Sequence, residues 1–352
     1  MKKNKLIITL ILIFSMILPA CVDIEVTTVL NADGSLERIL KVNSDSELKD
    51  FSSLPFPIDS SWQLSYEHDT SANNNKSHRY IFKKQFSSVD ELNNEYENSA
   101  NSLKKLNRKL NVEKKFRWFY TYISYEEKYE KLALGDYRPF KLYLSDIEKE
   151  VYKYENSDST NNKLNIDDEK FKILKSEIDK KYENWLTENI KDEVIMAIEQ
   201  DFITNNIRDK YKADLKSKRD TIYMVLDSLG VNDLQEKFYS FLNQLYRTKE
   251  FDKIITSKES YLTKFEKNLE LIVGQPGFKY NLQMPGLLID TNSESIKGNM
   301  LSWQFEPTEA FFVTTVQRAE SRIINLWAFV VSGLFLMGVL IFLLIPTFRR
   351  KK

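Results

Sequence analysis

The alternation of apolar and polar positions changes twice along this chain of 352 residues. Near the start, residues 22–30 alternate apolar and polar side chains, residues 31–34 supply a turn, and residues 35–42 continue as an extended run. Alternation with a period of two is typical of a strand with one buried face. We therefore predict a β-hairpin at this position. Further strand-like runs, the last rich in aromatic residues, lie at residues 62–67, 78–86 and 115–125.

The centre of the chain lacks both residue types that most often break helices. No glycine lies between Gly135 and Gly230, and no proline lies between Pro139 and Pro276. Apolar side chains recur there at steps of three and four, which is the mark of one buried face per helix. We predict a mostly helical insertion at residues 156–275. Its apolar stripes are interpreted as a packed core, with a partner-binding or coiled-coil surface as the alternative.

After this helical stretch, the pattern returns to strand-like runs. These lie at residues 278–284, 300–305 and 311–317. The order strands, helices, strands predicts an α+β fold, with an antiparallel sheet formed from the N- and C-terminal flanking segments around the large helical insertion. The domain outside the insertion would then comprise residues 21–155 and 276–322.

A second kind of apolar run lies close to the C-terminus. Residues 326–345 are twenty consecutive residues without a charge, which is about the length needed to cross a hydrocarbon core of ~30 Å. Trp327 lies near the outer end of this run, and four cations follow its inner end at residues 349–352. We predict a transmembrane helix at residues 323–346 and a basic cytoplasmic tail at residues 347–352.

The N-terminus has the order of an export signal. Three of the first five residues are lysines, residues 6–18 are mostly apolar, and Ala20 precedes Cys21. This order resembles the lipobox of bacterial lipoproteins. The resemblance implies that the signal peptide, residues 1–20, is removed and that a diacylglyceryl group is attached to the thiol of Cys21. The alternatives are an ordinary signal peptide or an N-terminal membrane helix, but thirteen residues are short for a span of about 20.

The two terminal signals predict one topology. A lipid-modified Cys21 places the N-terminus outside the cytoplasm, and the cations after residues 326–345 place the C-terminus inside it. We expect a protein of the bacterial cytoplasmic membrane, lipid-anchored and single-pass, with its large domain on the extracytoplasmic side. Its predicted partners are membrane lipid, through Cys21 and residues 326–345, and an envelope protein of unknown identity.

The charge balance argues against one class of partner. The chain carries 51 basic and 51 acidic residues, so its net charge is zero. Nucleic-acid binding depends on a positive field that neutralises phosphates. We therefore expect no nucleic-acid partner. Since Cys21 is the single cysteine, no intramolecular disulfide can form.

The sequence offers few candidates for chemistry. His68 and His78 are separated by a polar, loop-like segment, which we interpret as an exposed loop and at most a weak metal site. G-x-S-x-G, H-E-x-x-H and P-loop motifs are absent from the sequence. We predict no catalytic residues, no cofactor and no metal site. Two carboxylates that folding brings together leave no trace in a sequence, so an enzyme acting on cell-wall glycans remains a third possibility.

A second resemblance rests on short motifs near both ends of the chain. They are Cys21-Val22-Asp23-Ile24, Asp33-Gly34-Ser35, Met284-Pro285-Gly286, Asn292, Gly298-Asn299 and Trp303, followed by a single terminal helix. In this order they resemble the LppM-type bacterial lipoprotein domain, although the helical centre has no counterpart there. The resemblance implies a membrane-attached, extracytoplasmic α+β domain without a known catalytic centre, of a kind suspected of binding lipids.

These observations favour a non-enzymatic, membrane-tethered extracytoplasmic lipoprotein that acts as a binding or scaffold component of the bacterial cell envelope. The alternative is a domain that binds lipids or other hydrophobic ligands. It rests on the aromatic run at residues 116–125, whose large side chains on both faces would line an apolar cavity or, more simply, form a strand buried on both sides.

Overall fold

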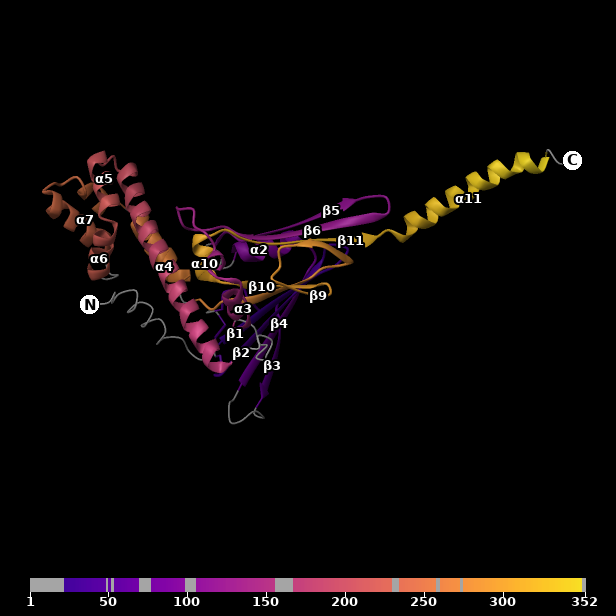
Figure 1. Ribbon diagram of the computed structural model, residues 1–352, viewed down its shortest axis with the longest axis horizontal. Helices are drawn as coiled ribbons and strands as arrows, with labels where there is room; N and C mark the ends of the chain where they lie inside the picture. Colours follow the sequence, from indigo (N-terminus) through magenta and orange to yellow (C-terminus); the bar gives the residue numbers. More distant parts are fainter. Residues whose placement is uncertain are drawn as a thin grey trace.

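A computed structural model of the chain describes residues 22–48, 50–51, 54–69, 77–98, 106–155, 167–229, 234–257, 260–272 and 275–349. The predicted signal peptide and Cys21 lie outside the described residues. The predicted mixed α+β fold is confirmed, and Figure 1 shows a central β-structure with helices at one end and a single long helix at the other.

The larger sheet joins the two flanking segments of the chain. Its strands, in spatial order, are β3 (Gln63–Asp69), β4 (Ser77–Phe86), β2 (Leu36–Ser44), β1 (Val22–Leu30), β7 (Phe278–Gln283), β10 (Met300–Phe305) and β9 (Ser295–Lys297). β1 and β7 pair in parallel, whereas the other neighbours pair antiparallel. This parallel pair is the seam between the N- and C-terminal parts.

A second, smaller sheet lies against the first. Its strands, again in spatial order, are β5 (Lys109–Phe116), β6 (Tyr120–Tyr129), β11 (Thr315–Ile324) and β8 (Leu287–Thr291), all antiparallel. Alternate residues of β1, β2 and β6 are buried, as expected for sheets that pack face to face around a shared core. The flanks therefore form a two-layered sandwich where the sequence pattern predicted one sheet.

Short helices close the edges of this sandwich. They are α2 (Val89–Asn98), the 3₁₀ turn η2 (Phe140–Tyr143), α3 (Asp146–Glu155) and α10 (Pro307–Phe312). The helix α2 contacts β4 and β5 and buries Leu92 and Tyr96. The helix α3 contacts the long helix of the insertion.

The insertion is helical, as predicted. Its helices, which we call the helical arm, are α4 (Asp168–Thr204), α5 (Asp209–Ser217), α6 (Arg219–Leu229), α7 (Leu234–Tyr246), α8 (Asp252–Ile255) and α9 (Tyr261–Ile272). The helix α4 has 37 residues, which corresponds to about 55 Å. Asp167 caps its N-terminus by accepting a hydrogen bond from the amide of Lys170. The helix α9 returns along α4 and contacts α10, so it leads the chain back to the sandwich.

The terminal helix α11 (Leu326–Arg349) follows β11 after a single residue. Its segment Leu326–Leu343 is long and apolar enough to cross a membrane, and almost all of it is exposed. Figure 1 shows α11 extending away from the sandwich, at the end opposite the helical arm.

Two strand predictions were wrong in detail. Residues 115–125 do not form one strand, because the chain reverses between Phe116 and Tyr120 and splits the run into β5 and β6. Residues 311–317 include the end of α10, and the last strand begins at Thr315. Neither boundary is marked by glycine or by a proline at the break, and both are set by contacts with distant parts of the chain.

Candidate functional site

The turn between β5 and β6 holds the base of α11. We call Phe116–Tyr120 the hairpin tip. The ring of Phe116 stacks on Trp327 with centroids 6.1 Å apart, and Trp118 meets the same indole edge-on at 5.2 Å. Phe119 lies 4.7 Å from Phe329. Aromatic pairs at these separations add to the stability that burial provides. The hairpin tip and the first turn of α11 therefore form one aromatic cluster.

Asn325 fixes the hairpin tip to the helix through hydrogen bonds. Its side-chain amide donates to the carbonyl oxygens of Arg117 and Trp118, at 2.8 and 3.3 Å, and its backbone N–H donates to that of Phe119 at 2.9 Å. Its Oδ1 accepts a hydrogen bond of 3.0 Å from the hydroxyl of Thr121. One side chain thus uses its donor and its acceptor to join the sandwich to α11.

A second cluster is buried between the sheets and is centred on a carboxylate. Glu127 on β6 lies between two guanidinium groups and is fully buried. Arg38 Nη2, from β2, is 2.9 Å from Glu127 Oε2, and Arg108 Nε, just before β5, is 2.6 Å from Oε1. Both arginine side chains are 1% exposed. This ion-pair cluster links the larger sheet to the smaller one.

Tyrosine hydroxyls complete the surroundings of this carboxylate. Tyr129 donates to Glu127 Oε1 at 3.0 Å, and Tyr280, from β7, donates to Oε2 at 2.7 Å. Tyr125 also donates to Oε2. The hydroxyl of Thr28 on β1 lies 2.8 Å from that of Tyr280. Residues from β1, β2, β6 and β7 therefore converge on one buried charge.

The electrostatics of this cluster indicate a structural role. Burial by itself would raise the pKa of Glu127, but the Arg108 and Arg38 guanidinium groups outweigh it and hold that pKa well below its usual range. Two cations face one anion, and Arg108 lies over the ring of Tyr96 at 4.0 Å from the centroid. Since Glu127 and both arginines are closed to solvent, this cluster offers a substrate no access.

Two acidic side chains lie close to the contact between α10 and η2. Glu306 and Glu309, at the start of α10, are half-buried, and burial raises the pKa of both, that of Glu306 to about 7. Glu309 Oε1 accepts a 2.7 Å hydrogen bond from the amide of Phe140. Lys141, which pairs with Glu294, is the nearby cation. Burial thus disfavours the charged form of both carboxyl groups.

The histidines were placed wrongly by sequence reasoning. They do not lie in a loop, because His68 on β3 and His78 on β4 are directly opposed cross-strand partners, with ring centroids 4.9 Å apart. Pairing of β3 with β4 extends the sheet to both residues. His78 Nδ1 lies 2.8 Å from the hydroxyl of Tyr66. Within the described part of the chain, no group of three or more His, Cys, Asp or Glu side chains is arranged to hold a metal ion.

The one predicted site residue, Cys21, lies outside the described residues, so its lipid modification stays a prediction. The described chain begins one residue later, with Val22 at the start of β1. The hairpin tip, the Glu127 cluster and the Glu306–Glu309 pair were all missed by sequence reasoning. Each depends on contacts between distant parts of the chain, such as that of Glu309 with Phe140, and only the aromatic run at residues 116–125 gave a local signal.

Comparisons with known proteins give one structural neighbour. No protein-family model matches the chain, and no curated protein was found to match it. The chain is similar to the solved folded domain of the Mycobacterium tuberculosis protein LppM, at 7% identity and a TM-score of 0.28, over 88% of this chain and 94% of that domain. A likeness at this TM-score carries no argument about function.

Proposed function

We propose that this protein is a non-enzymatic, membrane-tethered extracytoplasmic lipoprotein, which acts as a scaffold or binding component of the bacterial cell envelope. The observation that carries the proposal is the position of the helical arm and of α11 at opposite ends of the sandwich (Figure 1). With α11 in a membrane, the sandwich lies at the bilayer surface and the arm extends away from it. This arrangement suits a module that presents a binding surface at a distance from the membrane.

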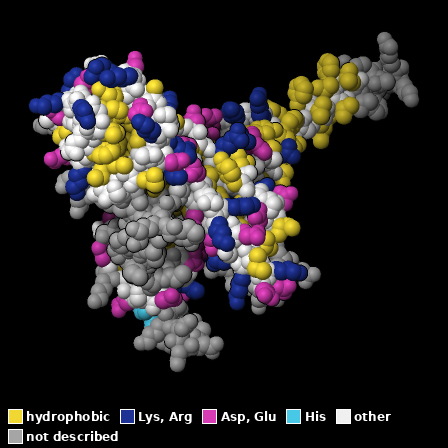
Figure 2. All heavy atoms as spheres, turned by 60° about the vertical axis from the view of Figure 1, so that its left-hand side comes forward, with side chains coloured by type: hydrophobic (Ala, Val, Ile, Leu, Met, Phe, Trp, Pro, Cys, Tyr) yellow, Lys and Arg dark blue, Asp and Glu magenta, His cyan; other side chains and the backbone are white. Residues whose placement is uncertain are grey.

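The arm carries apolar side chains that its own core does not use. Ile203 on α4, Met224 on α6 and Leu245 on α7 are 52%, 60% and 52% exposed. Figure 2 shows hydrophobic side chains gathered on the face of the arm that is turned to the viewer, with charged side chains around them. Apolar patches with a polar rim are typical of protein-binding surfaces. The proposed partner is another envelope protein.

Crosslinking in intact cells tests this role. A photoreactive amino acid at Met224 or Leu245 is expected to capture an envelope protein, whereas the same probe at Leu64, an exposed residue of β3, is expected to capture none. Identification of the captured protein by mass spectrometry defines the partner. If neither arm position gives a specific product above the Leu64 control, the scaffold role is contradicted.

The attachment at the N-terminus has its own test. We expect labelled fatty acid to be incorporated into the wild type and not into Cys21→Ser. Equal labelling of both proteins would contradict the lipobox interpretation. The scaffold role would survive that result, because α11 alone is sufficient for stable attachment to a membrane.

The proposed topology is tested by protease protection. Protease added to spheroplasts is expected to degrade the sandwich and the arm while a tag after residue 352 stays protected. Cleavage of the tag under conditions that leave cytoplasmic proteins intact would overturn this orientation.

A second candidate function is binding of a lipid or other hydrophobic ligand between the sheets. Gln317 and Ser321 on β11 are 1% and 0% exposed, and their side-chain polar atoms have no hydrogen-bond partner among the described residues. Buried polar groups nearly always have a partner, so a polar ligand group or water is a natural complement here. Native mass spectrometry of the purified protein is expected to retain a lipid in the wild type and to lose it in Gln317→Leu. Lipid-free wild-type protein would eliminate this candidate.

A further inference from the structure

We propose that the hairpin tip is inserted into the phospholipid bilayer beside α11, so that the domain enters the membrane at two adjoining points. The proposal rests on the proposed membrane crossing by α11. It assigns a lipid-contacting role to Phe116–Tyr120. Four observations support this role: the position of Trp118 along α11, the hydrogen bonds of the turn, the exposure of its aromatic side chains and the cations beside them.

The depth of the hairpin tip follows from one hydrogen bond. Trp118 Nε1 donates to the hydroxyl of Ser332 at 2.8 Å. Ser332 lies six residues after Leu326, the first residue of α11, which corresponds to about 9 Å along the helix axis. The headgroup region of one leaflet is about 5–7 Å thick, the difference between the whole bilayer and its core divided by two. The indole of Trp118 therefore lies at the depth of the upper acyl chains when Leu326 is at the membrane surface.

The same hydrogen bond makes this depth compatible with an apolar medium. A tryptophan at a membrane surface usually directs its N–H to water or to a headgroup. In this protein, the hydroxyl oxygen of Ser332 accepts the hydrogen bond of the Trp118 N–H, so that N–H does not depend on water.

The carbonyl groups of the turn are also paired. Unpaired carbonyl groups are not tolerated where lipid replaces water. The four successive carbonyl oxygens of residues 117–120 all accept hydrogen bonds, the first three from Asn325 and that of Tyr120 from the amide of Arg117 at 2.7 Å. These four carbonyl oxygens therefore do not depend on water.

The side chains of the hairpin tip remain open to the surroundings although they are apolar. Phe116, Trp118 and Phe119 are 59%, 47% and 39% exposed. They adjoin the exposed apolar surface of α11, where Trp327 is 51% and Val330 is 62% exposed. The apolar surface is therefore continuous from the helix to the hairpin tip, and this continuity favours the bilayer as its occupant.

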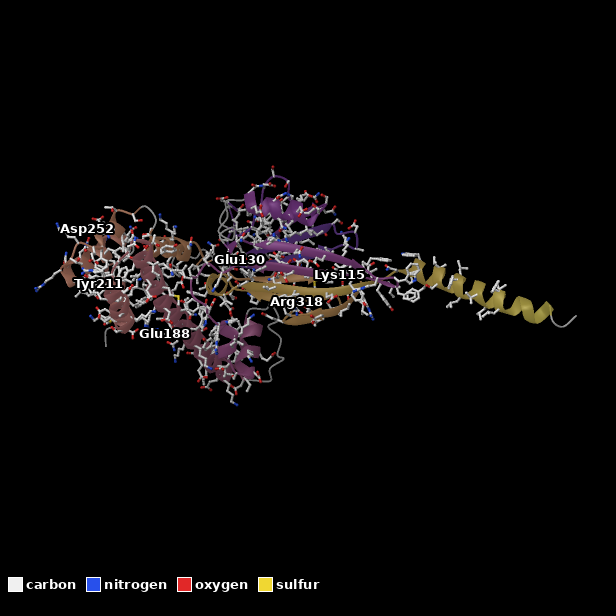
Figure 3. All side chains as sticks on the ribbon, turned by 90° about the horizontal axis from the view of Figure 1, so that it is seen from above. Lys115, Glu130, Glu188, Tyr211, Asp252 and Arg318 are labelled. Atoms are coloured by element: carbon white, nitrogen blue, oxygen red, sulfur yellow. The ribbon has the colours of Figure 1, made fainter. Side chains whose placement is uncertain are left out.

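Cations adjoin this apolar surface. Lys115 and Arg117 on the hairpin are exposed, and Figure 3 places Lys115 at the junction with α11. On β11, the guanidinium of Arg322 lies 4.8 Å from the ring centroid of Tyr120. Lysine and arginine beside exposed aromatic rings suit a surface that meets anionic headgroups and acyl chains together.

Fluorescence of the full chain in vesicles tests the proposal. Cys21→Ser removes the single native thiol, and one cysteine is then introduced at Phe119, at Leu334 in α11 or at Thr204 in the arm, and labelled with an environment-sensitive dye. The vesicles contain phosphatidylcholine and phosphatidylglycerol, with or without nitroxide-bearing acyl chains. We expect the Phe119 label to lose iodide quenching and to gain nitroxide quenching to the same extent as the Leu334 label. The Thr204 label is expected to behave in the opposite way.

The outcomes separate this inference from the proposed function. If the Leu334 label is in the membrane but the Phe119 label is quenched by iodide like that at Thr204, the insertion of the hairpin tip is overturned and the membrane crossing stands. If the Leu334 label is also open to iodide, both are overturned. A Phe119 label protected from both quenchers indicates a protein contact and also overturns the insertion. Phe116→Cys provides a second reporter if the Phe119 variant does not fold.

Discussion

Glu127 accepts hydrogen bonds from two arginines and three tyrosines, and these groups come from both sheets. A buried ion pair between well-packed sheets has a high desolvation cost, and replacing the whole cluster with apolar residues would not by itself destabilise the fold. Removing the charge of one member has a different effect, because its oppositely charged partners then remain buried without a counter-charge. At the scale of the residue, Glu127 is therefore a position where a single substitution is expected to destabilise the fold strongly.

We expect Glu127→Gln to lower the free energy of unfolding by about 3–5 kcal/mol, because Arg38 and Arg108 would remain as unpaired buried cations. Urea denaturation of the protein in nanodiscs measures this loss. Glu126→Gln is the matched control, since Glu126 lies on the opposite, exposed face of β6 and its loss is expected to change little. Equal stability of the two variants would show that the cluster does not hold the sheets together.

The pKa of Glu306 predicts a pH dependence of stability. Burial raises this pKa from 4.5 to about 7, so the folded chain binds the proton more tightly than the unfolded chain does. Stability is therefore expected to decrease as pH rises from about 4.5 to about 7, by about 1–3 kcal/mol. Glu306→Gln should remove this decrease and be relatively more stabilising at pH 8 than at pH 4. Thermal unfolding across this range checks the prediction, and an unchanged pH profile in the variant would contradict it.

At the scale of the elements, the local sequence pattern was sufficient to predict an element wherever interactions within that element or with its neighbour in the chain determine its structure. The β1–β2 hairpin, the helices of the arm and α11 were all predicted from alternation, from the absence of glycine and proline, and from length. At the β1–β2 turn, Gly34 has a φ of 99°, as its position in the turn predicted.

The elements that were missed depend on distant contacts. The turn at residues 117–119 has no glycine, proline or asparagine, and it is held by Asn325, about two hundred residues later in the chain. The division into two sheets likewise depends on which strands pair, and alternation alone does not specify the partner of a strand. For the same reason, none of the three side-chain clusters at the candidate site could be read from the sequence.

Asp201 stabilises the arm at the point where α9 begins. Its carboxylate accepts hydrogen bonds from the backbone of Tyr261 and Leu262, at 2.7 and 3.2 Å, and from the hydroxyls of Ser260 and Tyr239. This side chain on α4 therefore caps one neighbouring helix and binds another.

Asp201→Ala leaves these four donors without their acceptor, and we expect it to destabilise the arm by about 3 kcal/mol. Amide hydrogen exchange should accelerate most in α7 and α9, while the amides of β1 and β7 keep their protection. Asp209→Ala is the control, because Asp209 is exposed and its carboxylate pairs with Lys212 at the surface of the arm. Uniform acceleration across the sandwich would show that the arm and the sandwich unfold as one unit.

At the scale of the whole molecule, the junction at Asn325 would determine how the domain stands on the membrane that α11 is proposed to cross. A free linker after β11 would allow any orientation, whereas the aromatic and hydrogen-bonded contacts of the hairpin tip fix one. The proposed tether thus sets orientation as well as attachment, and the arm is held away from the lipid.

Energy transfer to the membrane tests this orientation. A donor dye at Met224 in the arm is expected to transfer little energy to acceptor-labelled headgroups, whereas a donor at Asp290 on β8, in the sheet next to α11, should transfer strongly. Asn325→Ala should reduce the difference between the two positions, because the contacts that orient the domain are lost. Equal transfer from both positions in the wild type would contradict an arm that stands away from the bilayer.

The parallel pairing of β1 with β7 also has a consequence for biosynthesis. Thr28 and Tyr280 are in contact although they lie 252 positions apart in the chain, so β1 is synthesised long before its parallel neighbour β7 exists. The last strand, β11, leads directly into α11, so in the proposed topology the sandwich would be completed only when the apolar helix reaches the export channel. We expect nascent chains that end before Phe278 to leave β1–β4 sensitive to protease, and chains that extend past Asn325 to protect them. Folding of the exported domain and its release into the lipid would then be a single, coordinated event at the end of translation.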